Sequence, residues 1–102
     1  MNVTANANGD DGLSLIPNGP VTLRHVQADR NRDGGIQVEA TGGWWADWVA
    51  AEDVTAVANA DNGLAFWYVA GSLDVVGCRA DQNGDDGLDV WDIGGSVTIS
   101  DC

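Results

Sequence analysis

The chain has 102 residues, of which 16 are acidic and 4 are basic, and its net charge is −12. This length suits one domain or a piece of one, and this charge disfavours nucleic acid and anionic membranes as partners. No apolar run approaches the roughly 20 residues that cross a bilayer, and the given residues begin without the pattern of a signal peptide. The composition leaves cations, basic proteins and neutral glycans as partners.

One sequence pattern occurs four times along the chain. The copies are VTANANGDDGLSL from Val3, VQADRNRDGGIQV from Val26, VTAVANADNGLAF from Val54 and CRADQNGDDGLDV from Cys78. Each copy reads apolar, x, Ala, x, x, Asn, x, Asp, x, Gly, Leu or Ile, x, apolar, and successive copies begin 23, 28 and 24 residues apart. Repeats of this length are typical of solenoids, in which each repeat stacks on the next.

Short segments of alternating apolar and polar residues predict β-strands within each repeat. These segments are too short for helices, and Gly, Asn and Asp separate them. Three parallel strands per repeat give an all-β parallel β-solenoid of about four three-stranded coils, with residues 1–102 as a single module. In chain order, we expect strands near residues 21–23, 26–28, 36–38, 49–51, 54–56, 64–66, 73–75, 88–90 and 97–99.

Stacking in register places like residues of the repeat in columns along the coils. The Asn column is expected to form a ladder of side-chain amides, and the Gly column to supply a backbone angle that other residues resist. The Asn column is Asn8, Asn31, Asn59 and Asn83, and the Gly column is Gly12, Gly35, Gly63 and Gly87. The expected inward columns are Val3/Val26/Val54/Cys78/Cys102, Ala5/Ala28/Ala56/Ala80, Leu13/Ile36/Leu64/Leu88 and Leu15/Val38/Phe66/Val90.

The segment V-T-I-x-x-C, from Val97 to Cys102, and the recurrent N-x-D-x-G-I/L turn resemble the right-handed parallel β-helix of the pectate-lyase-like superfamily. The resemblance implies that this β-solenoid is an all-β, right-handed parallel β-helix. The resemblance covers nearly the whole chain except Gly42 to Trp48. It is specific for fold and weak for function, because that superfamily includes lyases, hydrolases, epimerases, adhesins and non-catalytic stalks. An extracellular or cell-surface location is what the resemblance implies.

An Asp column, made of Asp10, Asp33, Asp61 and Asp85, follows the Asn column. Coils about 4.8 Å apart would bring these carboxylates close enough to repel, and Arg30 and Arg32 are placed to compensate. We expect these residues to serve first as turn formers that need no cofactor. A calcium site at the same four residues is the alternative, because Ca²⁺ takes oxygen ligands.

Catalysis is a further interpretation of the acidic turns. Asn59-Ala60-Asp61 and Asp85-Asp86-Gly87 resemble the N-T-D and D-D-C elements of polygalacturonases, in which carboxylates serve as general acid and base. The His and the Arg-Lys elements of that family have no counterpart here, and the Asp recurs in every repeat. We therefore expect a non-catalytic module with a structural, adhesive or self-assembling role. The alternative is a fragment of a polysaccharide hydrolase or lyase that uses Asp61, Asp85 and Asp86.

Aromatic residues gather at the corner that follows the third strand of each repeat. Residues 42–48, GGWWADW, interrupt the repeat as a loop insertion that carries Trp44, Trp45 and Trp48. Trp67 and Trp91 lie 24 residues apart at one repeat position and should stack, with Tyr68 alongside. These residues form either a satellite core or an exposed platform for a sugar ring or a partner protein, with Asp47 and Asp92 nearby as hydrogen-bond acceptors.

The cysteines and the solenoid ends lead to two further expectations. Cys78 and Cys102 share one inward column, and in-register side chains point the same way, so we expect stacked thiols first. Oxidation of Cys102 at the end of the last coil is the alternative. A β-helix without caps presents unpaired strand edges at its ends. Either the chain is a piece of a longer solenoid, or its copies associate head to tail.

Overall fold

The computed structural model describes residues 3–4, 6–16, 19–39 and 48–102. The described residues form strands and no helix, so they contain no helix long and apolar enough to cross a membrane. The strands are β1 (Val3–Thr4), β2 (Leu13–Leu15), β3 (Val21–Gln27), β4 (Ile36–Glu39), β5 (Val49–Val57), β6 (Leu64–Trp67), β7 (Leu73–Val76), β8 (Arg79–Asp81), β9 (Leu88–Trp91) and β10 (Val97–Ser100).

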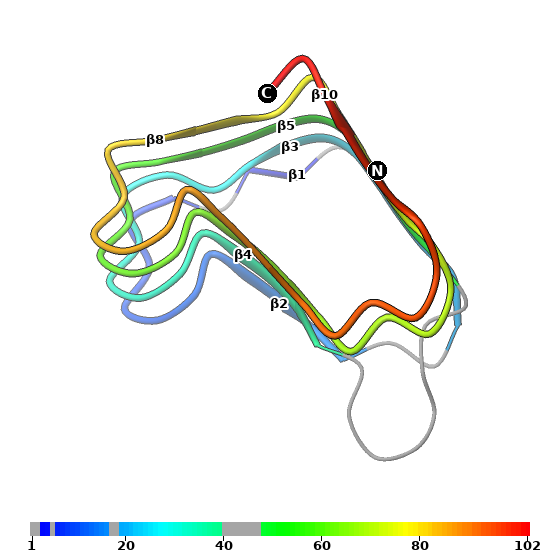
Figure 1. The fold of residues 1–102 in the computed structure, drawn as a ribbon. Helices are drawn as coiled ribbons and strands as arrows, with labels where there is room; N and C mark the ends of the chain where they lie inside the picture. The colour runs from blue at the N-terminus through cyan, green and yellow to red at the C-terminus, as the bar shows by residue number, and fades with distance from the viewer. Residues whose placement is uncertain (1–2, 5, 17–18, 40–47) are drawn as a thin grey trace.

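These strands pair in parallel and stack as the coils of a β-solenoid (Figure 1). One sheet has the order β2-β4-β6-β9, and the other has the order β1-β3-β5-β7-β10 with β8 beside β5. Each coil has three walls because β3 and β5 bend in the middle and contribute to two walls. About three turns separate the first strand of a wall from the last. The prediction of an all-β parallel β-helix is confirmed, and its count of about four coils is close.

Residues in the left-handed backbone region make the bends between walls. At one corner these residues are His25 (φ 53°), Asp53 (φ 55°), Gly77 (φ 64°) and Asp101 (φ 55°), each one repeat after the last. At the next corner they are Ala7, Arg30, Ala58 and Gln82, and at the third corner they are Tyr68 and Asp92. The strands predicted separately at 21–23 and 26–28 therefore form one bent strand, because the backbone stays extended on both sides of His25.

The glycine column has a different cause from the one predicted. Gly77 is the one glycine in the described part of the chain with a positive φ, so Gly12, Gly35 and Gly63 do not supply an unusual backbone angle. A Cβ at Gly12 would lie 2.4 Å from Nδ2 of Asn31, and a Cβ at Gly35 would lie 2.5 Å from the Gly63 carbonyl oxygen. Glycine is required there because the next coil occupies the space of a side chain.

The asparagine ladder is present and continuous. The backbone N–H and the Nδ2 of Asn8, Asn31 and Asn59 each donate to Oδ1 of the next asparagine, at 2.9 to 3.0 Å. Asn59 also donates from Nδ2 to the Ala28 carbonyl oxygen at 3.0 Å, and its side chain is almost completely buried. These bonds satisfy polar groups that the bend would otherwise leave without partners.

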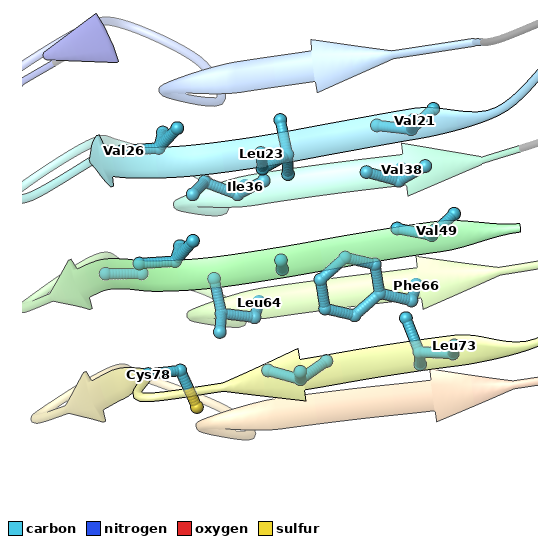
Figure 2. Close-up of a cluster of buried hydrophobic side chains, with 14 of the residues drawn as sticks. Val21, Leu23, Val26, Ile36, Val38, Val49, Leu64, Phe66, Leu73 and Cys78 are labelled. Carbon is cyan, nitrogen blue, oxygen red and sulfur yellow. The ribbon is translucent and has the colours of Figure 1, made fainter. Parts of the chain in front are cut away.

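The core fills the space between the three walls (Figure 2). The predicted inward columns are buried in the middle coils, and the largest fully buried side chains include Phe66, Leu23, Ile36 and Leu64. Val69 is also fully buried, at a corner where no core residue was predicted. Toward the last coil burial declines: Leu88 and Val90 are partly buried, and all four residues of β10 are exposed. Head-to-tail association of copies through such edges stays a prediction.

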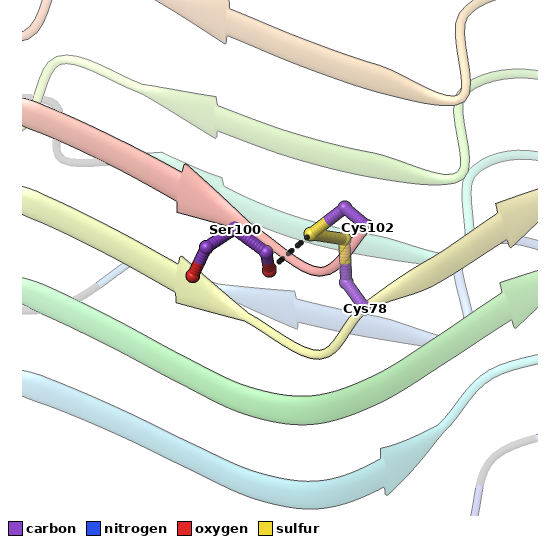
Figure 3. Close-up of a disulfide and its surroundings, with 3 residues drawn as sticks. All are labelled: Cys78, Ser100 and Cys102. Carbon is purple, nitrogen blue, oxygen red and sulfur yellow. Dashed lines mark hydrogen bonds between the residues drawn. A yellow bond between two sulfur atoms is a disulfide. The ribbon is translucent and has the colours of Figure 1, made fainter.

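Cys78 and Cys102 form a disulfide, so the expectation of stacked thiols is wrong (Figure 3). Their Cα atoms lie 4.6 Å apart, which is a distance that a disulfide permits. Cys78 lies between β7 and β8, and Cys102 follows β10, so neither residue belongs to a strand. The ladder therefore does not hold their side chains in parallel. Cys78 is buried and Cys102 is exposed, with its Sγ 3.4 Å from the Ser100 carbonyl oxygen.

Candidate functional site

The repeat places three side chains in one column on the outer side of a wall. Glu39, Trp67 and Trp91 are the last residues of β4, β6 and β9, and the register pairs Glu39 with Trp67 and Trp67 with Trp91. Phe66 and Val90 point into the core, and alternate residues of a strand point to opposite sides. The indoles of Trp67 and Trp91 therefore lie on the outer surface of the solenoid.

Two contacts fix the aromatic side chains at this corner. The Nε1 of Trp67 donates to Oδ2 of Asp89 at 2.9 Å, so this indole reaches toward the neighbouring column of the same wall. Tyr68 adopts a left-handed backbone conformation just after β6. Its ring centroid lies 5.5 Å from that of Trp91, with the ring planes tilted by 56°. The two rings are therefore tilted against each other and do not stack in parallel.

These residues line a surface cleft with a volume of about 420 Å³, which we call the aromatic cleft. Its lining residues are Glu39, Trp67, Tyr68, Asp89 and Trp91. A smaller hollow of about 180 Å³ shares Tyr68 with it and is further lined by Val69, Ala70, Asp92 and Gly94. The aromatic cleft lies in the size range of small-molecule sites.

The aromatic cleft combines exposed aromatic surface with carboxylates. The exposed fraction of Trp91 is 60% and that of Trp48 is 42%, whereas Trp67 and Tyr68 are half-buried. The Oε2 of Glu39 accepts from Nε2 of Gln37 at 3.2 Å, and Oδ2 of Asp89 accepts from Trp67. Within the described ranges, the second oxygen of each carboxylate accepts no protein hydrogen bond. Trp44, Trp45 and Asp47 lie outside the described residues.

The acidic turns lie at a different corner of the coil. Oxygen atoms of Asp10, Asp11 and Asp33 lie within 4.8 Å of one another. This group contains two of the four residues predicted for calcium and adds Asp11, whereas Asp61 and Asp85 are not part of it. Binding of calcium stays a prediction.

The arginines expected to compensate the Asp column form no ion pair with it in the described part of the chain. Arg30 and Arg32 form no ion pair with a described carboxylate, and the ion pairs found there are Arg24–Glu52, His25–Asp53 and Arg79–Asp81. The Arg30 backbone lies at a bend, and both arginine side chains are exposed.

The three residues of the catalytic alternative occupy adjacent coils. Asp61 is half-buried, and Asp85 and Asp86 are exposed. The Asp85 N–H donates to the Asp61 carbonyl oxygen at 3.3 Å, and the Asp86 N–H donates to Oδ1 of Asn62 at 3.0 Å. These bonds join stacked turns through backbone atoms of the Asp residues and leave the role of the carboxylates untested. Catalysis by these carboxylates stays a prediction.

The side chains of Asp11 and Asn62 each accept a hydrogen bond from a backbone N–H of the following coil, and the two residues lie two coils apart. Oδ1 of Asp11 accepts from the Gly34 N–H at 2.8 Å, as Oδ1 of Asn62 accepts from Asp86. Burial raises the pKa of the Asp11 carboxyl above its ordinary value of 3.8, the Gly34 N–H opposes that rise, and the charges of Asp33 and other carboxylates add to it. The charge at Asp11 is therefore unfavourable in the folded state.

We expect Asp11→Asn to raise the melting temperature at neutral pH by a few degrees. Asn keeps the acceptor for Gly34 and removes the charge. Because the pKa is raised on folding, the folded wild-type protein binds more protons than the unfolded chain just above pH 3.8, and it loses stability as the pH rises through that range. The advantage of the variant should vanish below pH 3.8. Thermal melts across pH test this, and an equal advantage at every pH would contradict it.

Sequence reasoning identified the aromatic residues of the cleft but missed its two carboxylates. Glu39 lies 28 residues before Trp67 and pairs with it in register. Asp89 lies two residues before Trp91, so both side chains are on the same side of the strand. The repeat register therefore indicates that both carboxylates lie on the side of the wall that carries the tryptophans. Neither residue belongs to a recurring acidic column, and this is why they were overlooked.

The chain matches no family model, no curated protein and no solved structure.

Proposed function

We propose that the chain is a non-catalytic β-solenoid module that binds a glycan through the aromatic cleft. The observation that carries this proposal is the exposure of Trp91 in a cleft that also presents Glu39 and Asp89. An indole held at the end of a strand is a rigid apolar surface, and it loses little conformational freedom on binding. The rest of the solenoid serves as a stiff support for this surface.

The chemistry of a sugar matches both parts of the cleft. A pyranose ring has an apolar face of C–H groups, which can cover an indole and remove it from water. Its rim carries hydroxyl groups, which can donate to the second oxygens of Glu39 and Asp89 in charge-assisted hydrogen bonds. A partner protein would need a larger apolar surface than this cleft offers.

Membership of the pectate-lyase-like superfamily and an extracellular location belong to the same proposal. The stacked N-x-D-x-G-I/L turns and the parallel coils support the first, because these features carried the resemblance. The Cys78–Cys102 disulfide supports the second, because disulfides persist in oxidising compartments. A glycan-binding module outside the cell would meet its ligands directly.

We expect the protein to bind at least one member of a panel of neutral cello-, manno-, xylo- and chitin-oligosaccharides. Trp91→Ala should weaken that binding at least about tenfold, the equivalent of roughly 1.4 kcal/mol. The matched control is Ile99→Ala, because Ile99 is 44% exposed on a different wall. Binding neither to this panel nor to any charged oligosaccharide, or equal binding by Trp91→Ala and wild type, would contradict the proposal.

The same samples test the enzyme alternative. If the module is non-catalytic, no new reducing ends or unsaturated uronates should form with these oligosaccharides or with polygalacturonate. Turnover that disappears in both Asp85→Asn and Asp86→Asn would show instead that the chain belongs to a polysaccharide-degrading enzyme.

A further inference from the structure

We propose that the aromatic cleft selects sugars that carry an ammonium group, so that its ligand is an amino-sugar glycan. This inference rests on the proposed function and names the chemical class of the glycan. Three features of the cleft carry it: the arrangement of its rings, the charge of its polar residues and the charge of the surface around it.

The rings of the cleft form adjoining aromatic faces. Tyr68 and Trp91 have centroids 5.5 Å apart and planes tilted by 56°, and Trp67 is in register beside Trp91. The negative face of an aromatic ring attracts a cation within about 6 Å of its centroid, and tryptophan does so most strongly. An ammonium group that enters this cleft can approach more than one ring face at once.

The charged residues of the cleft are two acids and no base. Glu39 and Asp89 line it, and no Lys or Arg is among its described lining residues. Each acid uses one oxygen in a protein hydrogen bond, to Gln37 or to Trp67, and these bonds fix where the carboxylates lie. An ammonium group has three donors and no acceptor. It therefore suits a site whose charged side chains are both acceptors.

The charge of the protein favours the same class of ligand. The net charge is −12, so cationic ligands are attracted over a distance and uronates are repelled. A neutral sugar gains stacking and ordinary hydrogen bonds in the cleft. A protonated amino sugar gains the same stacking and, in addition, cation–π attraction and stronger charge-assisted hydrogen bonds.

A pair of ligands with one backbone tests this directly. Chitin oligosaccharide is N-acetylated and neutral, and chitosan oligosaccharide of the same length carries free amines. Calorimetric titrations at about pH 6 keep the amines protonated, and salt at about 0.15 M limits the reach of general charge attraction to about 8 Å. We expect chitosan oligosaccharide to bind at least about tenfold more tightly, a ratio that the cation–π and charge-assisted contacts together can supply.

Three variants test whether the carboxylates of the cleft cause the preference for the ammonium-bearing ligand. Asp89→Asn and Glu39→Gln keep an acceptor for Trp67 and Gln37 and remove one charge each, so the ratio of the two affinities should fall in both. The matched control is Asp74→Asn, because Asp74 is exposed on the outer side of β7, where it pairs with Ala50 in another wall. Removing that charge should leave the ratio unchanged.

The outcomes separate this inference from the proposed function. Equal affinity for both ligands would overturn the ammonium preference and leave glycan binding in place. A ratio that falls as much in Asp74→Asn as in Asp89→Asn would show general charge attraction and would also overturn it. If neither ligand binds, the inference fails, and the neutral panel above decides the proposed function separately.

Discussion

Replacing Asn59 by Ala is expected to lower the free energy of unfolding by about 3 kcal/mol or more, because it leaves several buried polar groups without partners at about 1–3 kcal/mol each. Oδ1 of Asn59 accepts from the backbone N–H and the Nδ2 of Asn31, and its Nδ2 donates to the Ala28 carbonyl oxygen. Asn31 and Asn59 are only 3% and 2% exposed, so water does not replace these bonds. Urea denaturation followed by circular dichroism measures the loss.

The control for this prediction is Asn8→Ala at the exposed end of the same ladder. Asn8 donates one side-chain hydrogen bond, to Asn31, and water reaches its other groups. Its replacement should cost about 0.5–1.5 kcal/mol, the net value of one ordinary hydrogen bond. Similar losses in the two variants would mean that the ladder does not hold the coils together. Asn59→Asp, which keeps the acceptor and buries a charge, should also be much less stable than wild type.

Breaking the disulfide is expected to lower the free energy of unfolding by about 3 kcal/mol, from the chain entropy that a loop of this length releases. The bond joins residues 24 apart in sequence and ties the exposed strand β10 to the coil below it. Cys102→Ser removes the bond at an exposed position, so little packing is lost. Urea denaturation of the variant and the wild-type protein gives the difference.

Reductant serves as the control for the disulfide. Wild-type protein with reductant should match Cys102→Ser, whereas the variant itself should not respond to reductant. Hydrogen exchange should speed up first in residues 97–100, because this strand is exposed and depends on the bond. Wild-type protein that is equally stable with and without reductant would contradict the structural role given to Cys78 and Cys102.

The fold could be predicted from the sequence because each repeat position carries one physical constraint. Apolar residues at two-residue spacing specify the buried side of each strand, and the Asn and Gly columns specify the turn. The cause of the Gly column could not be read from the sequence. A close approach of the next coil and an unusual backbone angle both demand glycine, and the distances around Gly12 and Gly35 distinguish the two.

The bends and the disulfide were harder to predict for a related reason. The left-handed residues His25, Arg30 and Asp53 share no side-chain chemistry, so nothing in their identity marks the corner. Stacked thiols were favoured over the disulfide because side chains in register in a ladder point the same way. Cys102 lies beyond the end of β10, where its side chain is free to turn toward Cys78.

The aromatic cleft could be predicted only in part. Equal repeat positions placed Trp67 beside Trp91, but a register gives the column of a side chain and not its direction along the wall. The hydrogen bond from Trp67 to Asp89 crosses between columns, and the tilt of Tyr68 depends on its bend. The register places both carboxylates on the outer side of this wall, and the direction of the Trp67 side chain brings Asp89 into the cleft.

The central claim is that a sugar ring occupies the aromatic cleft, and a titration followed by heteronuclear NMR tests it most directly. The indole N–H signals of Trp67 and Trp91 and the backbone signal of Asp89 report on the cleft, and those of Thr22 and Asp74 report on another wall. With the oligosaccharide that binds best, the account predicts saturable shifts at the cleft and none at the other wall. Shifts confined to the other wall, or no shifts with any oligosaccharide of the panel, would contradict it.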